Sequence, residues 1–204
     1  MTKTISRLYD NYPEAQRAVT DLEAAGVPHS NISIVSNNSD DWYGNDKVDR
    51  DHDGVDDRTE GARTGAGIGA GVGGTAGLLT GLGLLAIPGV GPVVAAGWLV
   101  ATAVGAVAGA ATGGLVGGLT QMGVSKEDAD LYAEGVRRGG TLVSAKVEDG
   151  MVAQYEAVLD RSAVNIQDRG AAYRKDGWST FDPAAKPYDA EAVRKERQAY
   201  GGLR

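Results

Sequence analysis

The strongest pattern in the chain lies in residues 64–92, which read TGAGIGAGVGGTAGLLTGLGLLAIPGVGP. Glycine occupies every fourth position from Gly65 to Gly81, and no Asp, Glu, Lys or Arg occurs between Thr64 and Val124. Most of the 31 glycines of the chain lie in this interval, so the glycine excess is local. The pattern therefore marks a separate glycine-rich insertion in a chain whose flanks have an ordinary composition.

The four-residue glycine period predicts two closely packed helices. In water, glycine costs a helix about 1 kcal/mol relative to alanine, so such helices need either lipid or a tightly packed partner. We predict a glycine-zipper helical hairpin over residues 61–124, with arms Gly65–Ile87 and Val93–Leu119 and a turn between them. The glycines expected on the packing stripe are Gly65, Gly69, Gly73, Gly77, Gly81, Gly97, Gly105, Gly109, Gly113 and Gly117.

Two environments fit this hairpin. Each arm exceeds the roughly 20 residues that cross a bilayer. Arg63 and Lys126 would put both ends on the cytoplasmic side, and the first residues lack the apolar segment of a secretory signal. This favours a protein at the cytoplasmic face of the inner membrane, with the lipid bilayer as a partner. The alternative is a cytoplasmic soluble assembly with the zipper buried inside it, and both predict a homo-oligomer.

The flanks predict an α+β domain. Residues 1–36 read as strand, helix and strand, and residues 125–169 repeat that pattern after a leading helix. This order is that of a ferredoxin-like split βαβ domain, here interrupted by the glycine-zipper insertion. The expected strands are Thr4–Tyr9, Ile32–Val35, Thr141–Val147 and Val164–Ile166, and the expected helices start near Asn11, Ser125 and Asp149.

An acidic segment at 37–60 contains a calcium-like loop. Its last twelve residues match the spacing D-x-[DN]-x-[DN]-G-x₅-E, in which alternate carboxylates point at one cation and glycine permits the sharp turn. The loop resembles EF-hand loops, although no amphipathic helix precedes it. Calcium is the expected cofactor, and the alternative is a solvated acidic linker. The expected ligands are Asp49, Asp51, Asp53, Val55 through its carbonyl, Asp57 and Glu60.

Residues 170–204 form an aromatic and charged C-terminal tail. Asp189–Tyr200 can form a capped helix, whereas the prolines at 183 and 187 exclude one upstream. Aromatic side chains in a polar segment anchor it to a surface, which is either a neighbouring molecule or the same domain. The tail is therefore expected to be a docking strap without a catalytic role.

The composition argues against several functions. The formal net charge of −7 disfavours nucleic-acid binding, which needs clustered Lys and Arg. The chain has no cysteine and only two histidines, and no nucleophile, phosphate cradle or His–carboxylate cluster is evident. We therefore expect a non-enzymatic protein, with no small-molecule substrate identified.

The opening Ile5-Ser6-Arg7-Leu8-Tyr9-Asp10, the glycine-rich middle and the segment Met122–Val143 together resemble the bacterial heat-induced, general stress protein domain family. The resemblance implies a stress-associated protein and no catalytic mechanism. The leading hypothesis is a stress protein that self-assembles through its glycine-zipper hairpin in or on a membrane. The alternative is a calcium-responsive binding or structural module that forms a large soluble homo-oligomer.

Overall fold

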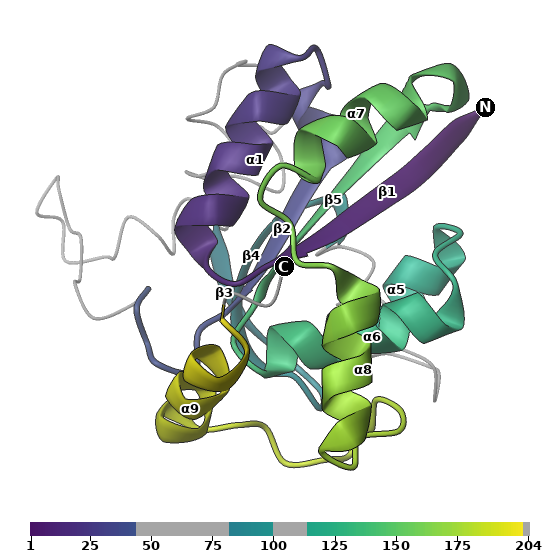
Figure 1. Ribbon diagram of the computed structural model, residues 1–204. Coiled ribbons are helices and arrows are strands. Elements are labelled where there is room, and N and C mark those ends of the chain that lie inside the picture. Colours follow the sequence, from purple (N-terminus) through teal and green to yellow (C-terminus); the bar gives the residue numbers. More distant parts are fainter. Residues whose placement is uncertain (44–81, 100–113, 202–204) are drawn as a thin grey trace, which may run out of the picture.

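The computed structural model describes residues 1–43, 82–99 and 114–201, and these form an α+β fold around one antiparallel sheet (Figure 1). The sheet order is β1-β5-β2-β4-β3, and every neighbouring pair of strands is antiparallel. Its strands are β1 (Thr2–Tyr9), β5 (Thr141–Glu148), β2 (Ile32–Asn37), β4 (Gly91–Gly97) and β3 (Gly83–Ile87).

Most of the elements expected in the flanks form for the expected reasons. Helix α1 (Tyr12–Ala24) begins where the Asn11 side chain accepts a hydrogen bond from the Glu14 amide. Helix α6 (Lys126–Arg137) is capped in the same way by Ser125. After β5, a short 3₁₀ turn (Asp149–Met151) leads into α7 (Val152–Leu159). The helix predicted from Asp149 is therefore confirmed in its main part.

Helices cover both faces of the sheet, so two hydrophobic cores form (Figure 1). Helices α1 and α7 bury one core against Val143, Ala145 and Val147 of β5. Helix α6 and helix α5 (Gly114–Gln121) bury the other core against the opposite face, where Leu142 lies. The strict alternation of side chains along a strand produces this division. The predicted alternation along 141–147 is confirmed.

The predicted helical hairpin is wrong where its two arms should meet. Residues 83–87 and 91–97 are strands β3 and β4, which extend the sheet beyond β2. The predicted turn between the arms is present, at residues 88–90, but it joins two strands. Gly89 and Gly91 have φ of 74° and 103°, a backbone region that glycine adopts without strain. The glycine period suggested a helix, whereas the short apolar runs on both sides of a Pro-Gly turn form a β-hairpin.

Gly97 shows what glycine does in this hairpin. It ends β4 with φ of 90°, and a Cβ atom there would lie 2.3 Å from the carbonyl oxygen of Ile32. The residue therefore permits close approach of two strand backbones. Its predicted place on a helix-packing stripe is corrected, because it does not lie in a helix.

The fourth predicted strand, Val164–Ile166, is also wrong. Val164 donates one backbone hydrogen bond to the Leu8 carbonyl at 2.8 Å, and the chain then turns into helix α8 (Ile166–Lys175). The Asn165 side chain accepts hydrogen bonds from the amides of Gln167 and Asp168, and so caps α8 at the point where the strand was expected. The ferredoxin-like arrangement is therefore not confirmed, and the coarser α+β class is.

Within residues 1–43, 82–99 and 114–201, no helix is both long and apolar enough to span a bilayer. Helix α5, at the end of the second predicted arm, has eight residues and packs Leu115 and Leu119 into the core. The first arm's residues 65–81 and the second arm's residues 100–113 lie outside the described part of the chain.

Candidate functional site

Two features of the fold are candidates for a functional role: a buried cluster of charged and aromatic side chains, and an open edge of the sheet. The cluster forms where α6, α8 and the C-terminal helix α9 (Ala190–Tyr200) meet the end of β1. We call it the clasp. Its members are Asp10, Glu134, Arg138, Arg169, Tyr173, Glu196, Arg197 and Tyr200.

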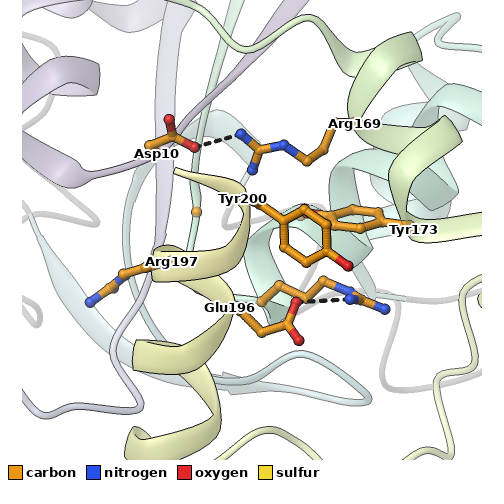
Figure 2. A pocket seen from close by; sticks show the side chains of 9 residues that line it. Asp10, Arg169, Tyr173, Glu196, Arg197 and Tyr200 are labelled. Carbon is orange, nitrogen blue, oxygen red and sulfur yellow. Dashed lines mark hydrogen bonds and ion pairs between the residues drawn. The ribbon is translucent and has the colours of Figure 1, made fainter. Parts of the chain in front are cut away.

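Every arginine of the clasp pairs with an acid from another turn or element. The Glu134 side chain, only 1% exposed, sits between Arg138 and Arg137. Figure 2 shows Asp10 facing Arg169, and Glu196 in its own ion pair. The pairs are Arg138 with Glu134 at 2.6 Å and Glu196 at 2.8 Å, Arg169 with Asp10 at 2.8 Å, and Arg197 with Asp40 at 2.5 Å.

Aromatic rings enclose these charges. The guanidinium of Arg138 lies 4.2 Å from the centre of the Tyr173 ring, and the Tyr173 and Tyr200 rings meet edge to face at 5.1 Å. Burial raises the pKa of Tyr173 to about 12, although Arg169 opposes that shift. Burial disfavours the charge on Arg138, but its contacts with Glu134 and then Glu196 outweigh it and raise its pKa. The tyrosine is therefore neutral and the arginine charged at neutral pH.

The clasp is too full to hold a substrate. Its cavity measures about 10 Å³, which is room for roughly one water molecule. Its arginines already have carboxylate partners, so an added anion would compete with fixed charges. The geometry instead ties α9 to the end of α6 and to the segment after β2, because Arg138 bonds Glu196 and Arg197 bonds Asp40 and the Gly139 carbonyl. The ring contact of Tyr173 with Tyr200 ties α9 to α8. The tail therefore packs on its own domain, which was one of the two expected arrangements.

The sequence predicts α9 correctly, whereas the cap that begins α8 was not recognised. Asp189 caps α9 by accepting from the Ala192 amide, as the predicted capped helix requires. Helix α8 has the same kind of signal in Asn165, followed by Asp168 in its first turn and basic residues in its last. The preceding Val164 suggested a strand and obscured that cap.

The second candidate is the open edge of the sheet at β3. Leu84 is 56% exposed, and Ala86 on the same face is also exposed. On the other face Ile87 is buried and Leu85 packs partly against the core. Among the residues that the structure describes, no strand pairs with the outer side of β3.

The opposite edge, at β1, is closed by hydrogen bonds from other elements. The Tyr132 hydroxyl on α6 donates to the Ser6 carbonyl at 2.7 Å, and the Val164 amide donates to the Leu8 carbonyl at 2.8 Å. Burial raises the pKa of Tyr132 to about 12, with Arg7 opposing, so this donor keeps its proton at neutral pH. The carbonyls of Ser6 and Leu8 on the outer side of β1 are therefore occupied, whereas among the described residues no such bond reaches the outer side of β3.

The predicted calcium ligands all lie outside the described residues, as do most of the predicted packing glycines. Gly117 is buried on α5, and Gly97 ends β4. Over residues 1–43, 82–99 and 114–201, no three His, Cys, Asp or Glu side chains gather as a metal site would need. The calcium prediction remains a prediction. The residues outside the described ranges are Asp49, Asp51, Asp53, Val55, Asp57, Glu60, Gly65, Gly69, Gly73, Gly77, Gly81, Gly105, Gly109 and Gly113.

Comparison with known families confirms the stress-protein resemblance over part of the chain. Residues 4–82 match the heat induced stress protein YflT domain. The matched residues include most of β1, all of α1 and β2, and end immediately before β3. This match covers less than half of the chain, and the similarity concerns that part only. No curated protein and no solved structure matches the chain.

Proposed function

We propose that this protein is a non-enzymatic, stress-associated protein that assembles with copies of itself through its glycine-rich region. The observation that carries the proposal is the open edge at β3, where the end of that region joins the sheet and leaves apolar side chains exposed. An exposed, uncharged edge strand is a template for pairing with another chain. The family match supports the stress-associated part of the proposal.

The position of the hairpin favours a soluble assembly over a membrane-crossing one. Strand β4 and helix α5 use both ends of the second predicted arm, so residues 100–113 are the 14 that remain between Leu99 and Gly114. A helix needs about 20 residues to cross the hydrocarbon core. Membrane insertion of that arm would have to pull Leu99, Leu115 or Leu119 out of a buried core. We therefore prefer assembly in water, with membrane contact as an outcome to be tested.

Sedimentation velocity of the full chain, purified without detergent at several concentrations, tests this proposal. We expect a particle larger than a monomer whose size rises with concentration. Gly73→Leu reports whether the predicted glycine stripe takes part in assembly besides β3, because it places a large side chain on that stripe. Gly150→Leu is the matched control, since nothing lies within 4 Å of a Cβ at that position. A monomer at every concentration, or protein recovered only with membranes, would contradict assembly in water.

Calcium binding by the acidic loop is a second proposal, which rests on the spacing of its carboxylates alone. Calcium should raise the melting temperature of the full chain, whereas magnesium at the same concentration should not, because the smaller ion demands a tighter octahedral site. Glu60→Gln, which removes the expected bidentate ligand, should abolish the difference. An identical melting temperature in calcium and in chelator would leave the segment an acidic linker.

A further inference from the structure

We propose that the surface of self-assembly is strand β3, and that two copies pair through it antiparallel about a two-fold axis at Leu85. The proposal rests on the self-assembly proposed above and adds the surface, the partner and the register. It would join two five-stranded sheets into one continuous sheet. Three properties of the edge carry it: the direction of its backbone groups, its symmetry and its lack of charge.

The direction of the backbone groups follows from the hydrogen bonds of β4. The Asn38 amide donates to the Pro92 carbonyl at 2.9 Å, so Pro92 turns its carbonyl toward β2. Pro92 lies opposite Ala86 in the β3–β4 register. Because backbone groups alternate sides along an antiparallel strand, Ala86 and Leu84 turn their N–H and C=O groups away from β4. Two donors and two acceptors therefore face the open edge.

These four groups are complementary to themselves. When a second copy runs antiparallel with its Leu85 opposite Leu85, Leu84 lies opposite Ala86 of the second copy, and Ala86 lies opposite its Leu84. Each of these is a pair that exchanges two hydrogen bonds, so all four outward groups of each copy are satisfied. A two-fold interface of this kind closes on itself and gives a dimer. In any other register, some of these outward groups lie opposite residues beyond the ends of the five-residue strand and lose their partners.

The side chains and charges are compatible with this pairing. The larger exposed Leu84 lies beside the smaller Ala86 of the second copy on one face, so the two apolar side chains can cover one another. The strand and its flanks from Leu82 to Gly91 carry no charged residue. Charged residues on edge strands are a common device that prevents edge-to-edge pairing, and here that device is absent from the strand. A partner of opposite charge is not required, and a second copy fits.

A disulfide cross-link tests the register. The natural chain has no cysteine, so any cross-link reports the introduced pair. Leu84→Cys mixed with Ala86→Cys places the two cysteines directly opposite at about 5.5 Å between Cα atoms, within the roughly 4.4–6.8 Å range of disulfides. In either variant alone the equivalent residues are diagonal neighbours at about 7–8 Å. We expect roughly tenfold more covalent dimer in the mixture, identified by mass, than in either variant alone.

Two further variants separate this inference from the proposed function. Ala86→Pro removes an outward N–H that β4 does not use, and Leu84→Lys adds a charge at an exposed edge position. Both should shift sedimentation toward the monomer by at least about tenfold in dissociation constant, since a buried charge or a lost hydrogen-bond pair costs more than 1.4 kcal/mol. Thr2→Lys, on the exposed end of β1, is the matched control and should assemble as the natural chain does.

The possible results have distinct meanings. Loss of assembly in both edge variants together with the mixed cross-link supports pairing through β3. Assembly that persists in both edge variants, with no preference for the mixed cross-link, overturns the inference but leaves self-assembly intact. A natural chain that is monomeric at all concentrations overturns both. Far-ultraviolet circular dichroism and thermal unfolding of each variant show whether the fold is retained.

Discussion

The two edges of the sheet are built from different kinds of sequence and end in different states. At β1, the strand is followed through Asp10 by the clasp, and its carbonyls accept hydrogen bonds from Tyr132 and Val164. At β3, the strand comes from the glycine-rich region, carries no charge, and leaves Leu84 exposed. The chain closes one edge with its own side chains and its own backbone, and among the described residues it does not close the other.

This difference shows how a chain can direct association to one side of a sheet. An unpaired edge is a hazard in most proteins because it pairs with any exposed strand. Here the closed edge cannot accept a further strand without losing bonds to α6 and to the segment before α8. Pairing through β3 displaces no such bond among the described residues, so association there is favoured. Four changes test this contrast, taken from the largest expected effect on stability to the smallest.

Glu134→Ala, in the clasp beside the β1 edge, should lower the free energy of unfolding most. The carboxylate is almost fully buried between Arg137 and Arg138, and removing it leaves buried guanidinium groups without one of their partners. We expect a loss of about 3–5 kcal/mol in the free energy of unfolding, measured by urea titration. Glu191→Ala, which removes an equivalent ion pair with Lys195 on the exposed face of α9, is the control and should leave stability unchanged. Equal effects of the two variants would contradict a structural role for the clasp.

Gly97→Ala should break the hairpin that carries the open edge. A Cβ atom at this position meets the Ile32 carbonyl oxygen at 2.3 Å, and the residue has φ of 90°. We expect a loss of about 2–4 kcal/mol from steric overlap and backbone strain. In a helix the same change would instead stabilise by about 1 kcal/mol. Thermal unfolding therefore distinguishes a strand from a helix at this glycine by the sign of the change in stability. Gly150→Ala is the neutral control.

Tyr132→Phe should weaken the closed edge at Ser6, whose carbonyl would keep only the hydrogen bond from the Arg7 guanidinium at 2.9 Å. Loss of the hydroxyl bonded to the Ser6 carbonyl should cost about 0.5–1.5 kcal/mol at neutral pH. Tyr12→Phe is the control, because burial raises the pKa of Tyr12 to about 12 as well, but its hydroxyl does not close the β1 edge. If both cost the same at neutral pH, the hydroxyl of Tyr132 has no special part in closing that edge.

The same tyrosines give a pH dependence with a definite sign. Burial raises the pKa of Tyr132 to about 12, above the value of about 10 in an unfolded chain. The unfolded state therefore loses its proton first, so the stabilisation is fully present below pH 10 and is lost as pH rises toward 12. Tyr132→Phe and Tyr12→Phe should each make the loss of stability between pH 10 and 12 less steep, as measured by urea titration at each pH. An unchanged slope would contradict the raised pKa values.

Leu84→Lys should have the smallest effect on folding and a large one on association. The side chain is already more than half exposed, so the free energy of unfolding of the monomer should change by less than about 0.5 kcal/mol. Its effect on the dimer was given above. A large loss of monomer stability would mean that Leu84 is a core residue of the single chain. In that case the open edge would be needed for folding.

How far the sequence predicted this fold depended on whether local signals agreed with one another. Asn11, Ser125 and Asp189 each cap a helix at the predicted place, because capping depends on a few neighbouring residues. The alternation of Thr141–Val147 correctly predicted both faces of β5. The glycine period failed over 83–97, because periodicity alone does not distinguish a buried strand from a buried helix in a short apolar run. The clasp was missed because its members come from four separate segments.

The sequence alone determined β1, β2, β5, the helices α1, α6, α7 and α9, and the location of the glycine-rich region, since each depends on residues close together in the chain. Only the tertiary structure decided that residues 83–97 join the sheet, because strand pairing is a contact between distant segments and Gly97 matters only through its approach to Ile32. It also decided which edge is closed. That depends on Tyr132 and Val164 reaching β1, and their separation in sequence from Ser6 and Leu8 gives no sign of it.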